Sequence, residues 1–148
     1  MRYLLGIILT SCALISCSSM IISHDEDLAA SRAVEFIETA FIKKDLDKGY
    51  TLLSANSKRY INFEQFKEMR NKMHPTSFPA NVHATDFEPI PGQKGMNIFL
   101  TGANGSDSFY YRLGMEGTAQ TGYMVSGVYR GNGPYPPSNL WQKLKTPH

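Results

Sequence analysis

The chain has 148 residues, enough for one ordinary domain, and its 42% apolar and 19% charged residues are typical of a protein with a buried core rather than of a disordered chain. Its formal net charge of only +2 excludes the strongly basic surface on which nucleic-acid binding depends. We therefore expect one folded domain without a nucleic-acid partner.

The first residues form a segment of a different kind. Arg2 supplies one positive charge, and the run from Leu4 to Ser16, LLGIILTSCALIS, contains no charged residue. This run is shorter than the about 20 apolar residues that cross a bilayer, and its basic, apolar and small residues follow the order of a secretory signal. A buried N-terminal helix is the alternative, but a signal peptide over residues 1–16 explains the pattern better.

The end of this segment, Leu14-Ile15-Ser16-Cys17, resembles the lipobox of bacterial lipoproteins. In that family the cysteine thiol is alkylated with a diacylglyceryl group and a signal peptidase cuts before it, which implies that Cys17 begins the mature protein and that residues 17–24 are a lipidated tether. Leu9-Thr10-Ser11-Cys12 also fits the pattern, so Cys12 is a rival, although it leaves a very short apolar run. The sequence has only these 2 cysteines, so we expect no disulfide in the domain.

Three helices are expected between residues 23 and 73. A capping box at Ser23 opens the first, whose apolar residues recur at three- and four-residue spacing and give it one buried face. Asp45 caps the second, where Gly49 costs about 1 kcal/mol relative to alanine and therefore indicates a close contact with another helix. A box-like cap at Asn62 opens the third, FEQFKEMRNKM.

Beyond residue 82 the apolar period changes to two, which predicts strands. Four are expected, joined by short turns as in an antiparallel meander, over residues 82–90, 95–102, 108–117 and 121–130. In the last of them, one face is expected to carry Tyr123, Val125 and Tyr129. The Pro- and Gly-rich tail, residues 131–148, either packs on its own domain, which we favour, or serves as a recognition segment in an assembly.

Helices followed by a meander predict an α+β fold, with N-terminal helices packed on a curved four-stranded antiparallel sheet. The stretches AVEFIETAFIKKDLDKGYTLLS and FEQFKEMRNKM, followed by these strands, resemble the NTF2-like (cystatin-like) superfamily over about residues 28–130. The resemblance implies that residues 25–130 form a cone, in which the sheet wraps around a long helix.

A ligand of such a cone would lie against the sheet. The candidate pocket residues on the strands are Phe109, Tyr111, Arg112, Tyr123 and Tyr129. Enzymes of this superfamily place an acid or base inside the cone, and the candidates here are His83, Asp86, Glu88, Tyr110 and Tyr111. None of them lies in a recognisable motif, and packing or solvent exposure is the simpler interpretation of each.

No cofactor or metal is expected. The histidines, which would be the ligands in a mature domain without cysteine, are scattered along the chain at His24, His74, His83 and His148, with no two at ligand spacing on one helix.

These patterns predict a lipid-anchored, non-enzymatic protein of the bacterial cell envelope that binds a protein partner or a small apolar ligand on its sheet face. The lipoprotein resemblance also implies sorting: Ser18, where aspartate would signal inner-membrane retention, favours the outer membrane facing the periplasm in a Gram-negative organism. The alternatives are a cone enzyme with isomerase- or dehydratase-type acid–base chemistry, and a structural lipoprotein that acts through its tail. A homodimer stays open as well.

Overall fold

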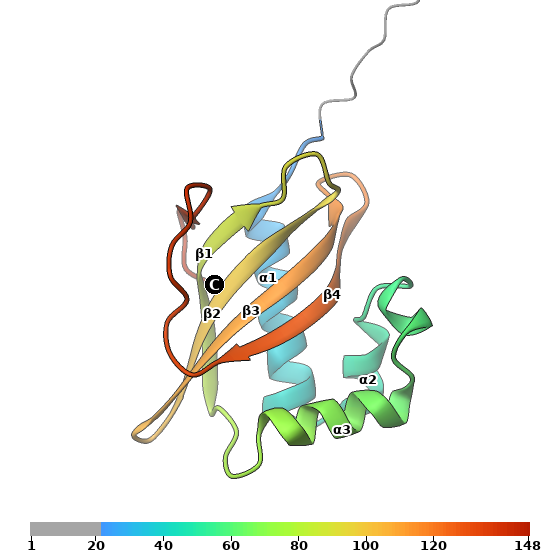
Figure 1. Cartoon of the computed structure of the whole chain (residues 1–148), viewed down its shortest axis with the longest axis vertical. Coiled ribbons are helices and arrows are strands. Elements are labelled where there is room, and N and C mark those ends of the chain that lie inside the picture. The colour runs from blue at the N-terminus through green and yellow to red at the C-terminus, as the bar shows by residue number, and fades with distance from the viewer. Residues whose placement is uncertain (1–21) are drawn as a thin grey trace, which may run out of the picture.

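The computed structural model describes residues 22–148, so the expected signal peptide and the acylation candidates Cys12 and Cys17 lie outside the described residues. Three helices pack against one antiparallel sheet of five strands in the order β4-β3-β2-β1-β5 (Figure 1). The expected α+β class is confirmed, whereas the sheet has five strands instead of four. In residues 22–148 none of the helices has the length and apolar character needed to cross a bilayer.

Helix α1 (Glu26–Ile37) lies along the inner face of the sheet and continues as a π-helical turn, η1 (Glu38–Ile42). Five of its residues are fully buried, and three of these are alanines, whose small side chains let the helix pack closely. Asp25 caps the helix by accepting a hydrogen bond from the Leu28 N–H at 2.9 Å. The expected cap at Ser23 is wrong, because Asp25 is the N-cap and Ser23 lies before the helix, where its carbonyl accepts from the Ala119 N–H in the β3–β4 turn.

The two further helices are α2 (Leu46–Thr51) and α3 (Phe63–Met73). Asp45 caps α2 through the Lys48 N–H at 3.0 Å, and a reciprocal capping box at Asn62 opens α3, so both expected caps are confirmed. A Cβ on Gly49 would lie 2.7 Å from the Ala40 Cβ, so the predicted close helix contact at this glycine is also confirmed.

The sheet is a continuous meander that the tail completes. Its strands are β1 (Asn81–Pro89), β2 (Gly95–Asn104), β3 (Asp107–Thr118), β4 (Gly122–Gly131) and β5 (Gln142–Lys143). The inner face of β2 and β3 forms the centre of the core against α1, with the buried side chains of Ile98, Leu100, Phe109, Tyr111 and Leu113.

A β-bulge in β4 changes which side chains share a face. Ser126 is an extra residue there, since the register of β3 with β4 shifts by one at this point. Tyr123 and Val125, before the bulge, are buried on the inner face, as is Val128 after it, while Tyr129 is 53% exposed. The expectation that Tyr129 shares the face of Tyr123 is therefore wrong, because the bulge moves the two-residue period by one.

The tail crosses the outer face of the sheet and then joins its edge (Figure 1). The Trp141 ring stacks on Phe99 with ring centroids 3.8 Å apart, and Tyr135 contacts the same ring at 5.6 Å. Strand β5 then pairs with β1, and Leu144 enters the core. Residues 131–148 therefore pack on their own domain.

Candidate functional site

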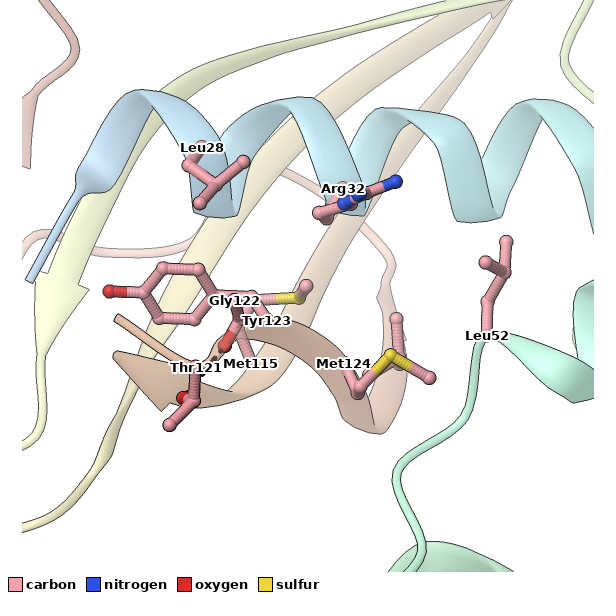
Figure 2. A pocket seen from close by; sticks show the side chains of 9 residues that line it. Leu28, Arg32, Leu52, Met115, Thr121, Gly122, Tyr123 and Met124 are labelled. Atoms are coloured by element: carbon pink, nitrogen blue, oxygen red, sulfur yellow. Dashed lines mark hydrogen bonds between the residues drawn. The ribbon is translucent and has the colours of Figure 1, made fainter. Parts of the chain in front are cut away.

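An open cleft lies between the first turns of α1 and strand β4. Figure 2 shows Leu28 and Arg32 on the α1 side, Tyr123 and Met124 on the β4 side, and Leu52 at one end. The cleft has a volume of about 240 Å³, and most of its lining side chains are apolar. Arg32, at its rim, is held by Glu35 at 2.7 Å on the solvent side. A hollow of this composition suits an apolar group of a ligand.

Tyr123 forms one wall of the cleft and ties the beginning of the described chain to the sheet. Its hydroxyl oxygen accepts a hydrogen bond from the Asp25 backbone N–H at 3.0 Å and lies 3.2 Å from Nδ1 of His24. Burial raises the pKa of Tyr123, and the charges of Asp25 and Glu26 raise it further, against the opposing effect of the Asp25 N–H bond. The phenol therefore stays neutral at pH 7 and fixes the approach to α1.

The five candidate pocket residues do not come together. Tyr123 lines the cleft, whereas Phe109 and Tyr111 are fully buried in the core on the same inner face. Arg112 and Tyr129 lie on the outer face, where the Arg112 guanidinium is 4.7 Å from the centroid of the Tyr129 ring. The β4 bulge and the alternation of β3 separate the two groups.

A buried polar cluster joins the end of α3 to the inner face of the sheet. His74 is only 3% exposed, and its Nε2 lies 3.1 Å from the Tyr111 hydroxyl while Nδ1 lies 3.0 Å from the Ser77 carbonyl oxygen. Since a carbonyl only accepts, Nδ1 carries the proton and Nε2 accepts from Tyr111. Burial is the main cause that lowers the pKa of His74 to about 4. The hydrogen bond to Ser77 raises this pKa by a smaller amount, and the charges of two arginines lower it slightly further. His74 is therefore neutral at pH 7.

These two arginines, Arg70 and Arg130, surround the cluster without an ion pair among the described residues. Arg130 donates to the Met73 carbonyl at the C-terminal end of α3, where a positive charge is favourable. Arg70 donates to the Ala40 carbonyl at 2.9 Å and lies 4.3 Å from the centroid of the Phe78 ring. The cluster is thus a packed support, in which Tyr111 and the Ser77 carbonyl satisfy the two ring nitrogens of His74.

Sequence reasoning missed this cluster, because His74 was weighed only as a metal ligand. The alternation of β3 did indicate that Tyr111 faces the core, but nothing local pairs it with a histidine 37 positions earlier.

The acid–base candidates on β1 lie on the outer face. His83 is exposed; Asp86 is paired in register with Phe99, below the tail; and Glu88 accepts hydrogen bonds from the Asn97 side chain and the Ser138 hydroxyl. Neither His83 nor the two carboxylates enter the inner face, so the idea that one of them acts as an acid or base inside a cone is wrong.

Among residues 22–148, no three side chains of the metal-binding types come close enough together to hold an ion. Comparisons of the chain with protein-family models, with curated proteins and with solved structures found no significant match.

Proposed function

We propose that this chain is a lipid-anchored protein of the bacterial cell envelope whose domain binds an apolar group of a ligand or protein partner in the cleft between α1 and β4. The observation that carries the proposal is the cleft itself, an open hollow of about 240 Å³ between Leu28, Leu52 and Tyr123. Largely apolar hollows with a few polar atoms at defined positions are the usual form of binding sites.

The position of the cleft fits an anchored protein. The described chain begins at Ile22, and the next residues contact Tyr123 at the edge of the cleft. An extended chain spans at most about 3.3–3.6 Å per residue, so an acylated Cys17 would keep this end of the domain within roughly 20 Å of the membrane surface. The cleft would then face components of the envelope, on the periplasmic side of the outer membrane in a Gram-negative cell.

We also propose that the domain has the form of an NTF2-like cone. Helix α1 along the inner face and α3 across one end support this form (Figure 1). The interior of the proposed cone is filled by side chains of α1 and of the strands, so the cleft at its edge, beside β4, is the site that we assign to a ligand.

The environment-sensitive dye N-phenyl-1-naphthylamine, which fluoresces in apolar surroundings, tests binding in the cleft. Wild-type protein is expected to bind it saturably, and Leu28→Trp, which fills the cleft, is expected to abolish most of the signal. Leu140→Trp adds the same ring at a site that is 41% exposed on the tail, and should bind as the wild type does. Equal binding by Leu28→Trp would contradict the assignment of the cleft.

The anchor is tested separately. Cys17→Ala should prevent labelling with tritiated palmitate and leave an uncut precursor, whereas Cys12→Ala should leave labelling and cleavage unchanged. If Cys17→Ala is still labelled and cut while Cys12→Ala is not, Cys12 is the lipidated residue. If the wild type itself is neither labelled nor cut, the chain is not a lipoprotein.

A further inference from the structure

The cleft contains a free strand edge, because β4 is the outermost strand on its side of the sheet. Gly117 of β3 donates its N–H to the Lys94 carbonyl, away from β4, at 2.9 Å. In the register with β4, Gly117 lies opposite Tyr123. Because Gly117 directs its N–H away from β4, the two residues form a non-hydrogen-bonded pair, and Tyr123 directs its own N–H and C=O away from β3. The main-chain N–H and C=O of Tyr123 therefore face the free edge, and outside the β3–β4 ladder they have no backbone hydrogen-bond partner within residues 22–148.

The next edge-facing residue, Val125, shows how this edge pairs. Its N–H donates to the Leu52 carbonyl at 3.0 Å, and its carbonyl accepts from the Ser54 N–H at 2.8 Å, so Leu53 lies beside it as one residue of a parallel strand. The preceding residues of that segment turn into α2, so they do not continue alongside β4. The pairing therefore includes Val125 but does not reach Tyr123, the neighbouring edge-facing residue, which lies at the apolar cleft.

The charges around this end of the cleft are mainly negative. Asp25 and Glu26 are close enough to the Tyr123 hydroxyl to raise its pKa. Arg32 is the cation in the cleft lining, and its charge is balanced by Glu35 at 2.7 Å. A ligand group beyond Tyr123 therefore meets two carboxylates that form no ion pair within residues 22–148, although Asp25 also caps α1.

We infer that the cleft binds an extended peptide segment of a partner protein by strand addition. One residue of the peptide exchanges two hydrogen bonds with the main chain of Tyr123, its apolar neighbour enters the cleft between Leu28 and Leu52, and a lysine or arginine faces Asp25 and Glu26. In this mode backbone hydrogen bonds supply affinity, and the cleft and the carboxylates supply specificity.

A peptide accounts for more of the site than the other occupants do. A small apolar ligand fills the hollow but leaves the backbone groups of Tyr123 without partners. A second copy has no free stretch in the middle of β4 to offer, because the Leu52–Ser54 segment already covers Val125. The inference rests on the proposal that the cleft is the binding site, and it adds the chemistry of the ligand.

The test uses the full chain as cells produce it, recovered from membranes or from the periplasmic fraction, and a phage-displayed library of random heptapeptides as the probe. We expect enrichment of sequences that alternate apolar and polar residues and carry a lysine or arginine at one end. Leu28→Trp should abolish binding of a selected peptide, and methylation of the peptide's backbone nitrogens should do the same. Glu26→Lys should weaken binding by about fivefold, consistent with loss of an exposed charge pair, whereas the control Glu64→Lys on α3 should leave it unchanged.

The other outcomes overturn the inference. Selected peptides that bind Leu28→Trp as well as the wild type would place the site elsewhere, and self-association that Leu28→Trp disrupts would make a second copy the occupant. If no peptide is enriched while N-phenyl-1-naphthylamine still binds in a Leu28-dependent manner, the peptide inference fails and the proposed apolar site stands. If neither probe binds, both fail.

Discussion

Replacing His74 by glutamine tests whether the buried cluster beneath the sheet makes the stability of the domain depend on pH. His74 is 3% exposed and neutral, with Nε2 accepting from Tyr111 and Nδ1–H donating to Ser77. In the unfolded chain the imidazole regains its ordinary pKa of about 6.5. Below that pH the unfolded state therefore binds a proton that the folded state does not bind until the pH approaches 4.

The size of the effect follows from the difference between the two pKa values. A fall from the ordinary value of 6.5 to about 4 corresponds to about 3 kcal/mol of folding free energy, of which about 2 kcal/mol is lost between pH 7 and pH 5. The sign is that of a depressed folded-state pKa: the contribution is complete above pH 6.5 and decreases as the pH falls towards 4. Carboxylates also titrate in this range, so the comparison with His74→Gln is needed to isolate the histidine.

The assay is urea unfolding of the wild type, His74→Gln and the exposed-histidine control His83→Gln at pH 7 and pH 5. We expect His74→Gln to be less stable at pH 7, because Tyr111 loses its partner, and to lose about 2 kcal/mol less than the wild type on going to pH 5. His83→Gln should follow the wild type. Parallel pH dependence of the wild type and His74→Gln would refute the reasoning.

Two further substitutions test how the elements pack. Trp141→Ala removes the ring that stacks on Phe99 and should lower the free energy of unfolding in urea by about 2 kcal/mol. The control Leu140→Ala, at an exposed site, should stay within about 0.5 kcal/mol of the wild type. Equal effects of the two substitutions would mean that this stack does not hold the tail. Gly49→Ala should lower the melting temperature, because its Cβ would lie 2.7 Å from that of Ala40, and overpacking costs about 1–3 kcal/mol; a higher melting temperature would show that the helices separate without strain.

The parts of the fold that depend on neighbouring residues were predictable from the sequence. Asp45 caps α2 and Asn62 opens α3, because each cap involves a side chain and a backbone N–H three positions apart. The cap of α1 was placed two residues too early, since Ser23 and Asp25 are both good caps and only contacts with distant Ala119 and Tyr123 distinguish them.

Features that depend on distant segments were not predictable. The Ser57 hydroxyl, which is distant in the sequence, donates to the Ser126 carbonyl at 2.8 Å and holds the bulge. Strand β5 forms only because the tail returns to β1. The cleft likewise combines Leu28, Leu52 and Tyr123, which lie on three separate segments. The strand alternation correctly placed Tyr123 and Val125 on one face, but nothing in the sequence marked the backbone of Tyr123 as unpaired.

Amide hydrogen exchange at Tyr123 tests the central claim, strand addition in the cleft, most directly. The Met124 amide serves as an internal control. Met124 lies opposite Glu116 in the register with β3, so its N–H points toward β3 rather than toward the free edge. In the free protein the Tyr123 amide should exchange faster than that of Met124, and a selected peptide should slow exchange at Tyr123 while leaving Met124 unchanged. A Tyr123 amide that is already protected in the free protein, or that is unaffected by a peptide bound at saturation, would contradict the account.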